Sequence, residues 1–172
     1  MTEVRGPLLV VALDDSEPAR VAFRWAVRRA ARTGGRVRAV RAIEGDGIAL
    51  DVAGCRWTID DDLLRGVELA ALRREAAGIA AELGAPEPEV SVDWRRGSFV
   101  DVLLATSADA DGLVVGERDH AVRGRRVRAL LVRSRCPVSV VRPPARHRSS
   151  EHRTAGGGPD PHVPAPLAPG AP

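Results

Sequence analysis

Asp14 and Gly116 are the residues of this sequence whose positions best suit ligand binding. Each stands at the end of a run that is apolar throughout, 8–13 and 112–116. Such runs are typical of strands buried on both faces of a parallel sheet. In open parallel sheets, ligands bind beyond the carboxyl ends of the strands, where the strand order reverses. With these two strands as the central pair, the Asp14 carboxylate and the Gly116 backbone should face one crevice.

A phosphate group would suit the same crevice. A helix expected to begin after Gly124 would direct its free backbone N–H groups there. Arg125 comes next, and a guanidinium can hold two phosphate oxygens at once. Ordinary structural roles stay open: Asp14 can cap a loop, and Gly116 and Gly124 can serve as turn residues. The neighbouring basic residues can simply form a solvated surface: Arg118, Arg123, Arg126 and Arg128.

Five strands and four helices in alternation are predicted, and they would build this crevice. Right-handed crossovers between such strands give an α/β fold with one parallel sheet and helices on both faces. The expected strands are 8–13, 36–43, 89–95, 112–116 and 138–141. The expected helices run from Ser16 to Gly34, from Asp60 to Leu83, from Ser98 onward, and after Gly124.

Apolar spacing predicts which helix faces are buried. For the second helix these residues are Leu64, Val67, Ala71, Ile79 and Leu83, and for the fourth Val127, Leu130 and Leu131. The segment 44–59 contains three glycines and no clear period, so it is interpreted as a loop. Loops of this length in compact domains often carry function.

Length and composition indicate one domain and a tail. The chain has 172 residues, 44% of them hydrophobic, which is enough for one core. We expect a domain over 1–143 and a disordered tail over 144–172, where large apolar residues are too few to offset chain entropy. No apolar run approaches the ~20 residues of a membrane helix. No secretory signal is evident, and two distant cysteines fit a reducing cytoplasm.

The charge pattern argues against a nucleic-acid partner, just as the lack of a long apolar run argues against a membrane partner. All 26 basic residues are arginine, and 23 acidic residues nearly balance them. Nucleic-acid recognition usually needs a clustered basic face with stacking aromatics, and only 3% of this chain is aromatic. No metal site is expected either, because the histidines of the tail are irregularly spaced: His147, His152 and His162.

Three stretches together resemble the universal stress protein family. VVALDDSEPARVAFRWAVRRA resembles the family's opening, DWRRGSFVDVLLATSADADGLVVG its third strand, third helix and fourth strand, and RALLVRSRCPVSVVRP its end. The resemblance covers about residues 7–143. It implies a doubly wound, Rossmann-like sheet of the adenine nucleotide alpha hydrolase type, with strand order 3-2-1-4-5. It also implies a homodimer through the last strand, Val138–Val141, and a stress-associated regulatory role without a catalytic reaction.

The glycine pattern of the family's ATP binders is incomplete in this chain. That pattern, after the fourth strand, is Gly, two residues, Gly, nine residues, Gly, then Ser or Thr. Here it begins at Gly116, but Asp119 takes the second glycine position, Gly124 comes five residues early, and Arg125 replaces the hydroxyl. Asp119 would add a β-carbon and a negative charge near phosphate, and a shorter loop supplies fewer N–H groups.

The base and ribose half of the family site is better preserved. By resemblance, Asp14 matches the carboxylate after the first strand, and Ala42 matches the second-strand backbone that meets adenine. No cofactor is therefore certain, and ATP or AMP are the candidates.

We expect a non-enzymatic regulatory or interaction module with weak or no ATP binding. The alternative is an ATP or AMP binder in which Arg125 replaces the hydroxyl. A third reading, an adenylate-processing enzyme using His120, is the least supported, since a lone loop histidine is usually solvated.

Overall fold

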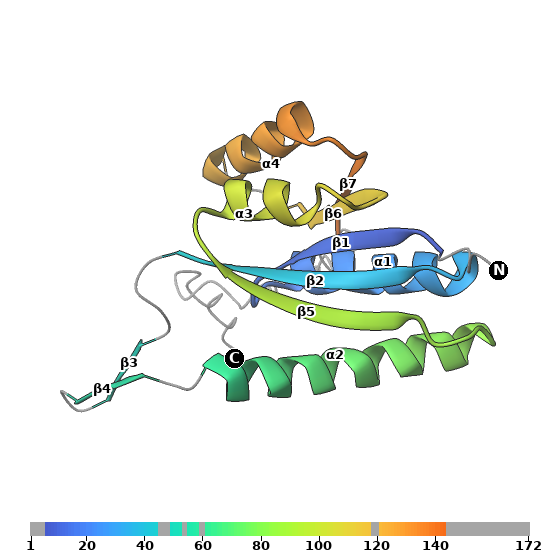
Figure 1. The fold of residues 1–172 in the computed structure, drawn as a ribbon, viewed down its shortest axis with the longest axis horizontal. Helices are drawn as coiled ribbons and strands as arrows, with labels where there is room; N and C mark the ends of the chain where they lie inside the picture. Colours follow the sequence, from blue (N-terminus) through green and yellow to red (C-terminus); the bar gives the residue numbers. More distant parts are fainter. Residues whose placement is uncertain (1–5, 45–48, 53–54, 59–60, 118–120, 144–172) are drawn as a thin grey trace, which may run out of the picture.

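The sheet of this protein has the predicted strand order. A computed structural model describes residues 6–44, 49–52, 55–58, 61–117 and 121–143. Five strands pair in parallel in the order β5-β2-β1-β6-β7 (Figure 1), which is 3-2-1-4-5 when these five are counted along the chain. Their bounds are β1 Leu8–Leu13, β2 Arg36–Ile43, β5 Glu89–Arg96, β6 Gly112–Gly116 and β7 Val138–Val141.

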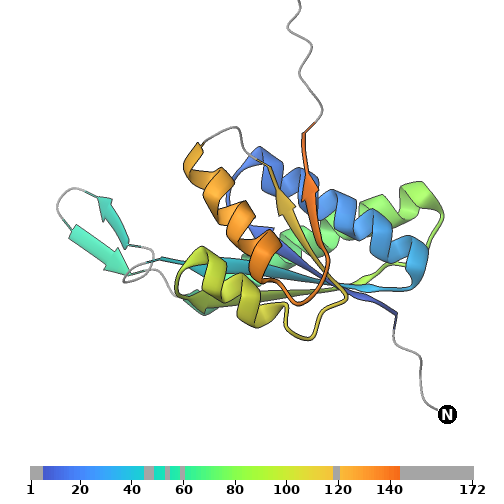
Figure 2. The ribbon, with the colours of Figure 1, turned by 90° about the horizontal axis from the view of Figure 1, so that it is seen from above.

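Four helices cover the sheet in two layers, one on each face (Figures 1 and 2). The layer of α1 and α2 packs on one face, and the layer of α3 and α4 packs on the other. Local sequence sets the limits of α1: Ser16 accepts a hydrogen bond from the Ala19 N–H at 3.3 Å, and Gly34 ends the helix with φ 65°. The bounds are α1 Glu17–Thr33, α2 Asp61–Leu83, α3 Phe99–Thr106 and α4 Ala121–Arg133.

Strand β1 lies at the centre, and all six of its residues are buried. Successive side chains of a strand point to opposite faces. Leu9, Val11 and Leu13 therefore join the core under α1 and α2, around Phe23. Val10 and Ala12 join the core under α3 and α4, which includes Leu103 and Leu130. The expectation of a strand buried on both faces is confirmed.

Two parts of the segment 44–59 are strands, which corrects the predicted loop. The segment contains the strands β3 Ala49–Val52 and β4 Cys55–Thr58, which pair antiparallel in a second, two-stranded sheet. This small sheet stands away from the main sheet (Figures 1 and 2). The loop interpretation was wrong because two four-residue strands separated by only two residues give too short an alternation to detect among the surrounding glycines.

Two predicted helix faces need correction. On α2, Val67 is 62% exposed and Ala71 is also exposed, whereas Ala76, Ile79 and Ala80 are buried. On α4, Leu130 is fully buried but its neighbour Leu131 is 54% exposed. Alanines are small enough to occupy either side of a helix, so the apolar spacing of α2 did not distinguish its faces.

The described residues end at Pro143, so the predicted tail over 144–172 lies outside them and stays a prediction. Among the residues that are described, no helix combines the length and apolar character needed to cross a membrane.

Adjacent leucines on α4 give a test of the two-layer packing. Leu130→Ala should lower the free energy of unfolding by about 2–5 kcal/mol, because it leaves a cavity under α4. Leu131→Ala should change it by less than about 0.5 kcal/mol, since that side chain is largely in solvent. Urea denaturation followed by circular dichroism measures both. Equal losses for the two variants would contradict the packing of α4.

Candidate functional site

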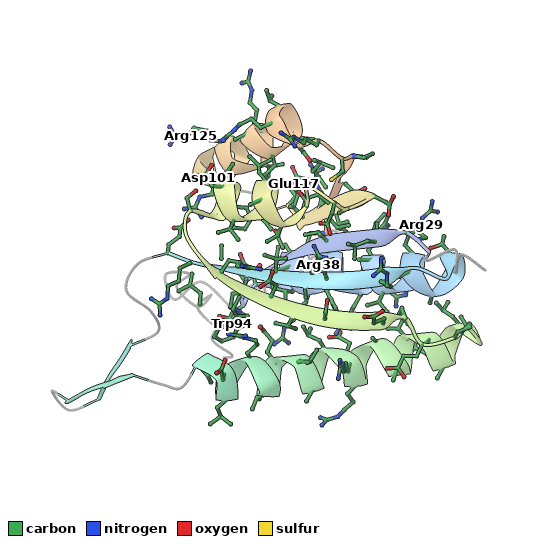
Figure 3. The ribbon with its side chains drawn as sticks, in the orientation of Figure 1. Arg29, Arg38, Trp94, Asp101, Glu117 and Arg125 are labelled. Carbon is green, nitrogen blue, oxygen red and sulfur yellow. The ribbon has the colours of Figure 1, made fainter. Side chains whose placement is uncertain are left out.

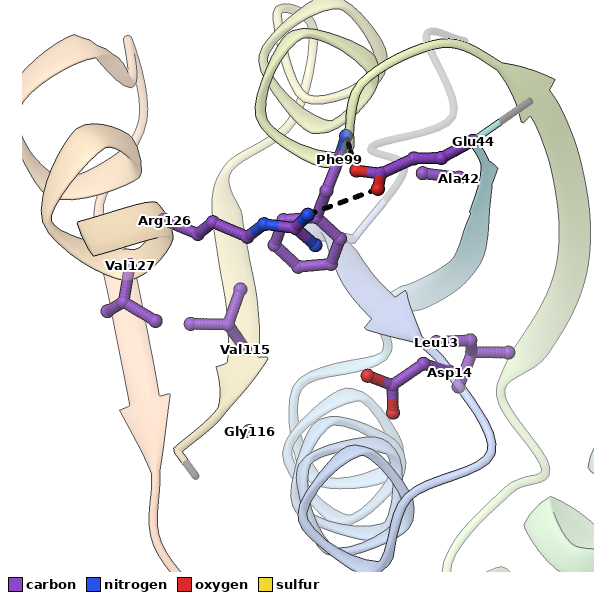
Figure 4. A pocket seen from close by; sticks show the side chains of 9 residues that line it. All are labelled: Leu13, Asp14, Ala42, Glu44, Phe99, Val115, Gly116, Arg126 and Val127. Carbon is purple, nitrogen blue, oxygen red and sulfur yellow. Dashed lines mark hydrogen bonds and ion pairs between the residues drawn. The ribbon is translucent and has the colours of Figure 1, made fainter. Parts of the chain in front are cut away.

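A pocket of about 250 Å³ opens where β1, β2 and β6 end, between these strands and the helices α3 and α4 (Figure 4). Parallel strands bring their carboxyl ends to one edge of the sheet, which is where ligands bind in such folds. The walls of the pocket are mainly apolar, and three of the lining side chains are charged. The lining residues are Leu13, Asp14, Ala42, Glu44, Phe99, Val115, Gly116, Arg126 and Val127.

Asp14 is the first residue after β1, and its carboxylate faces the pocket (Figure 4). The Ser16 N–H donates to Asp14 Oδ1 at 3.1 Å, and the Ser16 hydroxyl also lies in hydrogen-bond contact with the same oxygen. Ser16 at the same time caps α1. The carboxylate is therefore held in place by the residue that starts the next helix.

Ala42 and Gly116 complete the strand edge of the pocket. The pairing of β1 with β2 ends at Leu13 and Arg41, so Ala42 lies one residue beyond it. Gly116 lies against α1: a β-carbon there would stand 2.3 Å from the carbonyl oxygen of Pro18. Gly116 is thus required by close backbone packing, whatever the pocket binds.

Gly124 and Arg125 do not line this pocket. Helix α4 begins at Ala121, before Gly124, so the helix start expected after Gly124 is corrected. An exposed glycine costs a helix only about 1 kcal/mol and does not end it. Arg125 is exposed and projects from α4 (Figure 3). Asp119 and His120 lie outside the described residues.

Arg126, the next residue along α4, reaches into the pocket (Figure 4). Its Nη2 lies 3.1 Å from Glu44 Oε2, and its guanidinium carbon lies 5.7 Å from the centre of the Phe99 ring. Glu44 Oε1 accepts a hydrogen bond from the backbone N–H of Phe99 at 3.0 Å. That N–H, and then the nearby Arg126 charge, lower the pKa of the Glu44 carboxyl below its usual range.

A second charged cluster stands on the opposite side of the β1 end. Arg41 on β2 pairs with Glu68 on α2, and its Nη2 lies 3.0 Å from Asp15 Oδ1. The Trp94 N–H donates to Glu68 Oε2 at 2.5 Å. Burial alone would lower the pKa of Arg41, but its hydrogen bonds to Glu68 and Asp15 leave that pKa raised. The Asp15 side chain is 91% exposed, so its pairing with Arg41 adds little to the position of the loop that carries Asp14.

Sequence reasoning named Asp14, Ala42 and Gly116, and the structure brings these three around one pocket. It assigned no site role to Glu44 or Phe99 and treated Arg126 as basic surface. The signal for Glu44 was present, because it directly follows β2 just as Asp14 directly follows β1. Assigning Glu44 to a featureless loop concealed it.

The fold and pocket define an open parallel α/β protein with a crevice at its strand ends. The sequence profile of the universal stress protein family matches residues 8–142. The chain therefore belongs to the universal stress protein family. Among curated proteins, no sequence match to this chain was found.

Solved structures of the same family share the fold. A universal stress protein from Archaeoglobus fulgidus is 26% identical with a TM-score of 0.53, and the match covers 78% of this chain and 92% of that one. A universal stress protein in complex with cAMP is 22% identical, with a TM-score of 0.55 and coverage of 80% and 98%. An Arabidopsis thaliana family protein with AMP bound is 16% identical, with a TM-score of 0.52 and coverage of 84% and 97%.

Two glycines, Gly116 at the end of β6 and Gly124 within α4, differ in the space around them. Gly116→Ala should destabilise the fold by about 1–3 kcal/mol, because its β-carbon would collide with the first turn of α1. Gly124→Ala should be neutral or stabilise by up to about 1 kcal/mol, since no atom of the described residues lies within 4 Å of the added carbon. Thermal and urea unfolding of both variants measure this contrast. A fully stable Gly116→Ala protein would contradict the close approach.

Proposed function

We propose that this universal stress protein is a cytoplasmic, non-enzymatic regulatory module that binds an adenine nucleoside or its monophosphate in the pocket at the strand ends, with weak or no ATP binding. One observation carries the proposal. The pocket combines apolar walls and an anchored carboxylate, Asp14, with a single described cation, Arg126, that is already paired to Glu44.

The apolar part of the pocket suits a base and a sugar. Leu13, Val115 and Val127 offer apolar surface for a ring. Ala42 lies one residue beyond the last paired residues of β1 and β2, so its backbone groups on that side are not used by β1. Asp14 can accept hydrogen bonds from ribose hydroxyls. The volume of about 250 Å³ lies near the lower end for small-molecule pockets, roughly 300 Å³, and so favours a small ligand.

A triphosphate suits the pocket poorly. Among the described lining residues, two carboxylates, Asp14 and Glu44, face one guanidinium. A triphosphate would add three or more negative charges to a site that is already negative, at a cost that grows as water is excluded. A single phosphate adds only about 1.5–2 negative charges at pH 7, and Arg126 lies where it can contact them. The charge balance therefore favours adenosine and AMP over ATP.

Bound nucleotides in similar folds support this ligand class. The family structure with a TM-score of 0.55 contains cAMP, and the Arabidopsis thaliana protein contains AMP. Both carry a single phosphate. The proposal extends this class to the present chain on the strength of its own pocket.

The alternative ATP or AMP site that uses Arg125 has less support, because Arg125 is exposed and outside the pocket lining. For enzymatic turnover the structure offers no new support: the pocket lining described above contains no histidine or cysteine that could act as a base or nucleophile. The cytoplasmic part of the proposal rests on the sequence, chiefly on its two distant cysteines.

Calorimetric titration of the full chain with adenosine, AMP and ATP tests the ligand class. AMP should bind at least about tenfold more tightly than ATP, a difference of ~1.4 kcal/mol. Asp14→Asn should weaken both adenosine and AMP by about tenfold, because it removes a charge-assisted hydrogen bond.

The matched control is Asp15→Asn. Asp15 is adjacent, its side chain is 91% exposed, and it faces Arg41 rather than the pocket. It should leave nucleotide affinity unchanged. Submicromolar ATP binding by the wild-type protein, or equal effects of the two substitutions, would contradict the proposal.

We also propose that the protein forms a homodimer through the outer edge of β7, the last strand of the described sheet. Of the two edge strands, β5 carries several charged residues, which discourage pairing with another chain, whereas β7 carries none. Val140 on β7 is 37% exposed. The helices that contact β7 also expose apolar side chains, namely Trp25 on α1 and Val132 on α4.

Sedimentation of Val140→Lys and Ser91→Lys tests this interface. Val140→Lys should convert the dimer to a monomer, since it places a charge at the β7 edge. Ser91→Lys also introduces a lysine, at an exposed position of the other edge strand, β5, and this variant should remain dimeric. A monomeric wild-type protein, or a dimer lost only in Ser91→Lys, would contradict the assignment.

A further inference from the structure

The ion pair between Glu44 and Arg126 crosses the rim of the pocket. Glu44 follows β2 and Arg126 lies on α4, so the pair joins two elements that are far apart in sequence. Both side chains line the pocket, on the side away from Asp14 (Figure 4). A ligand anchored at Asp14 that extends across the pocket would meet this pair.

Arg126 does not depend on Glu44 alone for its position. Its guanidinium lies over the Phe99 ring, with 5.7 Å from the guanidinium carbon to the ring centre. An arginine held on an aromatic face keeps its planar set of N–H donors available at its edge. If Glu44 moved away, Arg126 would remain directed into the pocket.

Glu44 holds two donors that a phosphate would also use. One is the Arg126 guanidinium, and the other is the backbone N–H of Phe99, which donates at 3.0 Å. Both kinds of donor recur in phosphate recognition. The carboxylate is about half exposed, with 48% of its side-chain surface in solvent, so it can swing out without leaving a buried charge behind.

We propose that Glu44 is an internal competitor for the phosphate of the bound nucleotide, and that Arg126 is the residue that recognises that phosphate once Glu44 is displaced. This inference rests on the proposed nucleotide function and adds a specificity device to it. The neutral nucleoside binds without disturbing the pair. An anionic ligand must exchange its phosphate for the carboxylate, so Glu44 reduces the advantage of AMP over adenosine.

The decisive measurement is the ratio of AMP affinity to adenosine affinity in single variants of the full chain. Glu44→Gln should raise AMP affinity by about fivefold, the upper range for an exposed ion pair, and leave adenosine affinity within about twofold. Arg126→Gln should remove the preference for AMP over adenosine. Glu44→Ala should act in the same direction as Glu44→Gln, which keeps the test independent of one variant's folding.

Matched controls lie outside the pocket. Asp109→Asn removes a carboxylate that pairs with Arg38 at 2.9 Å, and Arg128→Gln removes an exposed arginine from the same helix as Arg126. Both should keep the wild-type ratio. A second readout uses the wild-type protein: the amide signal of Phe99 in a ¹H–¹⁵N spectrum should shift more on addition of AMP than on addition of adenosine, because only AMP displaces Glu44 from that N–H.

The outcomes separate the two proposals. If adenosine and AMP bind but their ratio is the same in wild type, Glu44→Gln and Arg126→Gln, the inference is wrong and the nucleotide function stands. If Arg125→Gln rather than Arg126→Gln removes the preference, the assignment of Arg126 is wrong. If wild type binds no AMP but Glu44→Gln does, the inference is supported in its strongest form. If no variant binds either ligand, both proposals fail.

Discussion

Burial of β1 on both faces is the constraint on which the rest of this structure depends. Its six apolar residues supply alternate side chains to the two helical layers, and its backbone pairs with β2 on one side and β6 on the other. No polar side chain fits along such a strand without a buried partner. The first position at which polar chemistry can appear is therefore Asp14, directly beyond the strand. The same reasoning places the polar side chains that follow the sheet strands into the pocket, Asp14 and Glu44, at the strand ends.

The elements with a strong local signal were predictable from the sequence. Unbroken apolar runs identified β1 and β6, and Ser16, Gly34 and Ser98 marked helix ends where the structure has them. The signal failed where side chains are small or segments short. The alanine-rich α2 offered several apolar faces, and only its packing against α1 and β5 selects one. The β3–β4 pair is too short to show a period.

The site was predictable to the extent that it is built from strand ends. Asp14, Ala42 and Gly116 come together because β2, β1 and β6 are neighbours in the sheet and parallel pairing aligns their carboxyl ends. The residues that helices contribute to the pocket were harder to predict from the sequence, because neighbouring residues on a helix point about 100° apart. Whether Arg125 or Arg126 faces the pocket depends on how α4 is rotated against the sheet. That rotation is fixed by buried residues such as Leu130, which no local pattern distinguished from Leu131.

The close contact of Gly116 with α1 alters how a glycine motif should be weighed. A glycine that both accommodates a ligand and fits against a neighbouring helix is subject to two independent selective pressures, and either one alone is enough to retain it. A family member that has stopped binding nucleotide would still carry glycine here, since the carbonyl of Pro18 leaves no room for a side chain. Positions without such a packing role, such as the open site at Gly124, are free to change once the ligand is lost. In this chain a glycine at position 116 therefore reports on architecture, whether or not the pocket holds a nucleotide.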